Sequence, residues 1–114
     1  MLTVYGIKTC DTVRKALKWL EAEGIPHTFH DFRKDGLEES MVATWVAALD
    51  WESVLNKRST TWKQLSDEDK NNLDERCAIS LMVAHPTLIK RPVFVYNNMI
   101  LQGFTDSVRG RIKE

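Results

Sequence analysis

The feature that most constrains the fold is the N-terminal stretch, in which the spacing of apolar residues changes from that of a strand to that of a helix. Residues 2–5 have the β-branched and aromatic content of a strand, and Gly6 ends this run. From Asp11 onward, apolar residues recur on one face of a helix, at Val13, Ala16, Leu17 and Leu20. The stretch therefore predicts a strand, a turn and a helix, with Cys10 at the end of the turn.

Cys10 lies at the expected start of this helix, where Thr9 or Asp11 is expected to supply the side-chain oxygen of the N-cap. Free backbone N–H groups and the positive end of the helix dipole meet there, and both favour the thiolate over the thiol. Lys8 adds a cation two residues earlier. Cys10 is therefore a candidate nucleophile. The alternative interpretation is a small hydrophobic residue with no chemical role.

The first half of the chain predicts a βαβα order. The first helix, at residues 11–23, is expected to end at Gly24, because glycine is favoured just past a helix and Pro26 prevents continuation. A weakly alternating strand is expected at 27–32 and a second amphipathic helix at 37–49. Such an order normally gives two parallel strands joined by a right-handed crossover.

The middle of the chain predicts further helices. Residues 51–62 are expected to connect elements, with at most a helical turn, and Ser66 is expected to cap a short helix interrupted at Asn71-Asn72. Residues 77–84 are apolar apart from one serine, which is typical of a helix buried on most sides. This pattern places Cys77 in the core.

The last part predicts a β-hairpin and a final helix. Two strand-like runs, 93–96 and 99–102, flank Asn97-Asn98, and two residues that tolerate positive φ between such runs favour a tight turn. Thr105 or Asp106 is expected to cap the last helix.

Composition excludes several classes of protein. The chain of 114 residues predicts one domain, 1–114, and its 16 Lys+Arg balance its 16 Asp+Glu, which argues against a direct nucleic-acid binder or a membrane-surface protein. It contains no apolar run of membrane-spanning length and no signal-peptide pattern, so a cytoplasmic location is expected. Neither a CxxC motif nor a Cys/His cluster with metal-ligand spacing is present, so we expect no metal site.

Two motifs together indicate a family. The first reads Tyr5-Gly6-Ile7-x-x-Cys10-Asp11-Thr12-x-x-Lys15-Ala16-x-x-Trp19-Leu20, and the second reads His85-Pro86-x-Leu88-Ile89-Lys90-Arg91-Pro92-Val93. With the predicted element order, they resemble the arsenate reductase (ArsC)/Spx family, most closely its YffB-like members. The resemblance implies an α/β, thioredoxin-like fold, βαβ followed by ββα in a mixed sheet, with an inserted helical segment at about 37–88. It also implies a cis Arg91-Pro92 bond beside Cys10, with Arg91 facing the same pocket.

The chain also departs from this resemblance at particular positions. Family members that reduce arsenate carry a histidine where Gly6 stands, and they hold the oxyanion with three arginines. Arg91 matches one of these arginines, Asn56 takes the place of the second, with Arg58 two residues on as a substitute, and Phe104 takes the place of the third. The oxyanion contacts of an arsenate reductase are therefore expected to be incomplete.

A related departure concerns the Spx-type regulators, which bind RNA polymerase. They often carry a second cysteine three residues after the first, where this chain has Val13. A CxxC redox switch is therefore not expected.

The function implied is that of a glutathione-dependent thiol oxidoreductase with a single reactive cysteine, Cys10. Because the motif has no second cysteine, an outside thiol must resolve any covalent adduct, and glutathione is the expected co-substrate, with no bound cofactor. The residues expected to bind glutathione or shape its site are Lys8, Thr9, Asp11, Thr12, Arg58, Arg91 and Pro92. Arg58 and Arg91 have the simpler alternative of solvated surface charges. Two other functions remain open: an arsenate reductase acting on an oxyanion substrate, and an Spx-like transcriptional regulator that binds RNA polymerase.

Overall fold

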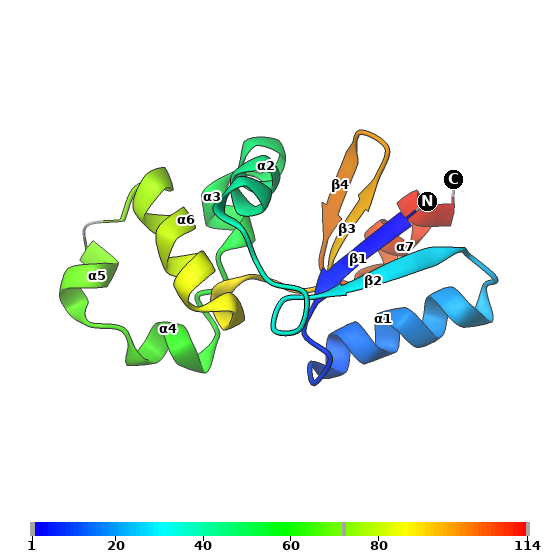
Figure 1. Ribbon diagram of the computed structural model, residues 1–114, viewed down its shortest axis with the longest axis horizontal. Coiled ribbons are helices and arrows are strands. Elements are labelled where there is room, and N and C mark those ends of the chain that lie inside the picture. The colour runs from blue at the N-terminus through cyan, green and yellow to red at the C-terminus, as the bar shows by residue number, and fades with distance from the viewer. Residues whose placement is uncertain (1, 72, 114) are drawn as a thin grey trace. The chain divides into compact units, whose positions relative to one another are not determined.

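The computed structural model describes residues 2–71 and 73–113, which form two compact units (Figure 1). The first, here called the sheet unit, comprises the segment that ends at Gly36 and the segment that begins at Arg91. The second, here called the helical unit, comprises Leu37–Lys90 and thus corresponds to the inserted segment expected at about 37–88.

The sheet unit contains a mixed four-stranded sheet in the order β2-β1-β3-β4. Strand β1 pairs in parallel with β2 and antiparallel with β3, and β3 pairs antiparallel with β4. The strands span Leu2–Gly6, His27–Asp31, Val93–Tyr96 and Met99–Gln102 in chain order. Two helices complete this unit, α1 (Asp11–Ala22) and α7 (Asp106–Lys113). The thioredoxin-like βαβ and ββα order is confirmed.

One face of the sheet forms the core of this unit. The strand register places Phe29 beside Val4, Val4 beside Phe94, and Phe94 beside Leu101, so one row of apolar side chains crosses all four strands. Because side chains alternate between the two faces of a strand, this row lies on a single face. The helices cover it with residues of α1 and α7, namely Ala16, Leu20 and Val108.

Several helices and strands begin or end at the turn and cap residues predicted from the sequence. Gly24 follows α1 with a φ of +67°, and its N–H donates to the carbonyl of Glu21 at 3.1 Å. Asn97 adopts a φ of +54° in the β3–β4 hairpin. The N–H of Val108 donates to Oγ1 of Thr105 at 3.2 Å, so Thr105 caps α7.

The helical unit contains five helices and one 3₁₀ turn among its described residues. Helix α2 packs against α6, and the buried side chains include Val42 and Trp45 on α2 and Ala78 and Met82 on α6. In chain order the elements are α2 (Glu39–Leu49), α3 (Trp51–Val54), α4 (Thr60–Gln64), α5 (Asp67–Asn71), α6 (Glu75–Ala84) and η1 (Pro86–Leu88).

The middle of the chain contains more helix than predicted, and its expected cap at Ser66 is present. The stretch 51–62, expected to be mainly a connection, holds α3 and the first turn of α4. Ser66 caps α5 as predicted, since the N–H of Asp69 donates to its hydroxyl at 3.2 Å. Helix α5 ends at Asn71, and Asn72, the other residue of the expected interruption, lies outside the described residues.

The placement of Cys77 in the core is wrong. Cys77 is exposed in the first turn of α6, where its N–H donates to Oδ1 of the N-cap residue Asp74 at 2.8 Å. Helix α6 buries Ala78, Ile79 and Met82 instead, so its apolar sequence covers a narrower face than the pattern predicts.

Within residues 2–71 and 73–113, none of the helices has the length and apolar character needed to cross a membrane.

Candidate functional site

Cys10 is held at the start of α1 by a tight turn after β1. Its N–H donates to the carbonyl of Ile7, and its own carbonyl accepts from the N–H of Arg14, both at 3.0 Å. Its backbone is extended (φ −77°, ψ 124°), so Cys10 itself is the N-cap residue. The expectation that Thr9 or Asp11 occupies this position is therefore wrong.

The pKa of the Cys10 thiol lies below its ordinary value. The largest single influence, partial burial of the sulfur, raises the pKa because it removes water from the thiolate. Interactions with the N–H of Val13, the guanidinium of Arg91 and the N–H of Thr12 together lower the pKa by more than burial raises it. The electrostatic environment thus favours the nucleophilic form of the sulfur.

Arg91 and Pro92 reach this site through the pairing of β3 with β1. Val93, the first residue of β3, lies opposite Tyr5 near the end of β1, so the residues just before β3 meet the loop just after β1. The Arg91-Pro92 peptide bond is cis, as the resemblance implies. Pro92 is fully buried, and its carbonyl accepts from the N–H of Gly103 at 2.9 Å. The guanidinium of Arg91 interacts with the Cys10 thiol through a hydrogen bond and through its charge.

The other residues expected at the site differ in where they lie. Lys8, Thr9, Asp11 and Thr12 are exposed around the start of α1, and Lys8 is not among the groups that lower the pKa of Cys10. The carboxylate of Asp11 forms an ion pair with Arg14. Arg58 belongs to the helical unit, where it is exposed and its N–H donates to Oδ1 of Asn56 at 3.1 Å. The other expected contact residues belong to the sheet unit.

Gly6 packs directly against the helix that carries the thiol. A methyl group at Gly6 would lie 2.6 Å from Cγ2 of Val13, whose side chain is fully buried. The N–H of Val13 is one of the groups that stabilise the Cys10 thiolate. Close approach of β1 to the first turn of α1 therefore supports the position of that N–H.

Gly6→Ala is expected to lower the free energy of unfolding by about 1–3 kcal/mol, because a stiff β-branched side chain must move to admit the methyl group. Displacement of Val13 is also expected to raise the pKa of Cys10. Urea unfolding and the pH dependence of Cys10 alkylation measure the two effects. Gly110→Ala in α7 is the matched control, since a Cβ there meets nothing within 4 Å. Equal stability of the two variants would contradict this account of Gly6.

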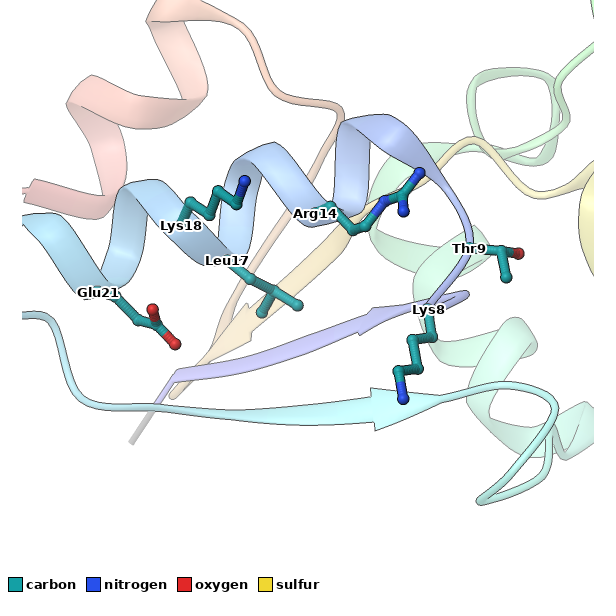
Figure 2. Close-up of a pocket in the computed structure, with 6 residues that line it drawn as sticks. All are labelled: Lys8, Thr9, Arg14, Leu17, Lys18 and Glu21. Carbon is teal, nitrogen blue, oxygen red and sulfur yellow. The ribbon is translucent and has the colours of Figure 1, made fainter.

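A groove of about 660 Å³ lies along α1 and is lined by Lys8, Thr9, Arg14, Leu17, Lys18 and Glu21. Figure 2 shows that Leu17 and Glu21 project from α1 toward the side on which Lys8 lies. Lys8 and Thr9 are predicted site residues, whereas the four lining residues of α1 are not among the predicted ones. Their spacing is the available signal, because positions 14, 17, 18 and 21 share one helical face.

Among the described residues, no group of three or more His, Cys, Asp or Glu is placed to hold a metal ion.

The chain matches one family model and is similar over most of its length to several known proteins. The model of the ArsC family matches residues 5–110. An uncharacterized protein of Haemophilus influenzae is 47% identical over 106 residues, which cover 93% of each chain. The global transcriptional regulator Spx of Enterococcus faecalis is 27% identical over 108 residues, which cover 93% of this chain and 81% of that protein. A solved structure of a YFFB protein is 38% identical, covers 98% of both chains and has a TM-score of 0.93.

Proposed function

Since the chain belongs to the ArsC family, we propose that it is a thiol oxidoreductase in which Cys10 is the nucleophile and glutathione is the thiol that resolves the covalent adduct. The observation that carries this proposal is the lowered pKa of Cys10 beside Arg91 and the N–H groups at the start of α1. A thiol with a lowered pKa is ionised at a lower pH, and its thiolate is also the better leaving group in disulfide exchange.

The reaction consists of two thiol–disulfide exchanges. The Cys10 thiolate attacks one sulfur of a disulfide substrate, forms a mixed disulfide with it and releases the other sulfur as a thiolate. A glutathione thiolate then attacks the substrate sulfur of this mixed disulfide, which regenerates the Cys10 thiolate and leaves substrate joined to glutathione. Arg91 stabilises the Cys10 thiolate both as the attacking and as the leaving group.

The remaining assignments follow from position and charge. Lys8 is proposed to attract a carboxylate of glutathione, and Thr9, Asp11 and Thr12 to shape the exposed rim around the start of α1. Pro92 is proposed to form the buried wall from which Arg91 projects.

Incubation with oxidised glutathione near pH 7 is expected to modify Cys10 much faster than Cys77. Cys77 is the more exposed thiol, but its pKa is raised by the neighbouring Asp74 carboxylate, which accepts a hydrogen bond from the thiol and repels the thiolate. Because the pKa of Cys10 is lowered, its reaction rate should reach its plateau at a lower pH than that of Cys77. Mass spectrometry of the intact protein and of its peptides measures the adduct at each site.

The variants Cys10→Ser and Cys77→Ser form the matched pair for this experiment. We expect Cys77→Ser to form the adduct at the rate of the unmodified protein and reduced glutathione to remove it, whereas Cys10→Ser should react only slowly. Preferential modification of Cys77, or no adduct at Cys10, would exclude Cys10 as the nucleophile.

The likeness to the regulator Spx of Enterococcus faecalis supports a second candidate function. In this case the protein would bind RNA polymerase and use its thioredoxin-like fold as a docking surface. The two candidates differ in their dependence on the thiol, because this motif carries Val13 where a CxxC motif would have its second cysteine. A stable complex with RNA polymerase that Cys10→Ser leaves unchanged, together with absence of the glutathione adduct, would favour the regulator.

A further inference from the structure

We propose that the groove of Lys8, Thr9, Arg14, Leu17, Lys18 and Glu21 binds the carboxylate-bearing part of an acidic peptide disulfide or thiol whose sulfur reacts at Cys10. This inference rests on the function proposed for Cys10. It adds four residues of α1, Arg14, Leu17, Lys18 and Glu21, to Lys8 and Thr9, which the proposed function already assigns to the glutathione site.

The spacing along α1 relates the groove to the thiol. Arg14, Lys18 and Glu21 lie four, eight and eleven residues after Cys10, and these intervals return to the same side of a helix. With a rise of 1.5 Å per residue, Arg14 lies about 6 Å and Lys18 about 12 Å along the helix axis from Cys10. An extended peptide covers about 3.4 Å per residue, so three or four residues span the distance from the thiol to Lys18.

The charges of the groove select the class of peptide. Lys8, Arg14 and Lys18 contribute three cations, and Glu21 is the single anion that lines it. Arg14 already pairs with Asp11, but both side chains are largely exposed, 58% and 82%, so a peptide carboxylate has access to the guanidinium. Carboxylates are thus favoured near the cations, and a neutral or ammonium group is favoured near Glu21.

The size and apolar content of the groove also fit a short peptide. Its volume of about 660 Å³ lies within the range of about 300–1,000 Å³ that is typical of small-ligand sites. Leu17 is half-buried and lies between the charged positions, where it can contact the aliphatic part of a peptide. The cations would also raise the local concentration of an anionic substrate beside the thiol before the exchange occurs.

The test compares three disulfides that differ in charge: oxidised glutathione (anionic), hydroxyethyl disulfide (neutral) and cystamine (cationic). In each reaction the Cys10 thiolate attacks one sulfur, forms a mixed disulfide and releases the other half as a thiolate. We expect the unmodified protein to react faster with the anionic disulfide than with the cationic one. In Lys18→Glu this rate ratio should fall roughly three- to tenfold, because an attraction is replaced by a repulsion.

Arg111→Glu in α7 is the control, since Arg111 is exposed in the same unit, is also a cation and lines neither this groove nor the adjoining pocket of Asp11, Arg14, Lys15 and Lys18. Its effect on the rate ratio is expected to stay below about twofold, as solvent and salt screen exposed charges. Arg14→Gln should lower the ratio in the same direction as Lys18→Glu, and thermal unfolding of each variant verifies that the fold is retained.

The failure of this inference is distinguishable from the failure of the proposed function. If Cys10 forms mixed disulfides but the rate ratio falls equally in Lys18→Glu and Arg111→Glu, or in neither, the groove does not dock the peptide and the inference is overturned. If none of the three disulfides modifies Cys10, the proposed function itself fails and the docking inference fails with it.

Discussion

Phe94→Ala is expected to lower the free energy of unfolding by about 3–5 kcal/mol, the range found for removal of a buried aromatic side chain. Phe94 is 1% exposed and lies in the centre of the apolar row across the sheet, between Val4 and Leu101. It belongs to the core cluster that α1 and α7 cover. Its removal opens a cavity that a four-stranded sheet and two helices cannot fully close.

Tyr96→Ala is the control, because Tyr96 lies two residues further along β3 and is 44% exposed. The free energies of unfolding of the two variants, measured with urea, should differ by more than about 2 kcal/mol, since substitutions at exposed positions usually change stability little. Similar midpoints and slopes for the two variants would show that the core of the sheet unit does not depend on Phe94.

Arg91→Ala is expected to weaken glutathione binding by about 1.5–3 kcal/mol, the usual contribution of a hydrogen bond to a charged group. The same substitution should raise the pKa of Cys10, because it removes both a hydrogen bond to the sulfur and a positive charge beside it. Calorimetric titration with glutathione measures the first effect, and the pH dependence of the alkylation rate measures the second.

Arg91→Lys provides the matched variant, since it retains the charge but loses the planar guanidinium. It should keep part of the pKa shift. Arsenate turnover by the unmodified protein should be slow, because Gly6, Asn56 and Phe104 are expected to leave the oxyanion contacts incomplete. Unchanged glutathione affinity in Arg91→Ala, together with rapid Cys10-dependent arsenate turnover, would favour arsenate reduction over glutathione-dependent thiol exchange as the function.

Local periodicity predicts most of the fold because neighbouring residues determine where elements begin and end. The strand before Gly6, the helix that ends at Gly24 and the hairpin at Asn97 all depend on signals of a few residues. Cys77 was misplaced for a different reason. The side of α6 that becomes buried is set by its packing against α2, which the apolar run of residues 77–84 does not encode by itself.

The same distinction applies to the candidate site: local sequence signals predict some of its features, and tertiary packing determines the others. The helix start at residue 11 follows from local periodicity, which nevertheless assigns the N-cap to the wrong residue, and the interaction of Arg91 with the thiol depends on the pairing of β3 with β1. The groove was missed because Arg14 and Lys18, taken alone, resemble any exposed charges of an amphipathic helix. Only the path of residues 8–9 beside α1 makes them part of a concave surface.

The two cysteines allow two different probes to be attached selectively to the protein. Cys10 lies in the sheet unit and Cys77 in the helical unit, and their pKa values are shifted in opposite directions. A donor fluorophore coupled at low pH should attach to Cys10, and an acceptor added at higher pH should attach to Cys77. In the natural sequence, without any substitution, two different probes can therefore be attached at two defined positions, one in each unit.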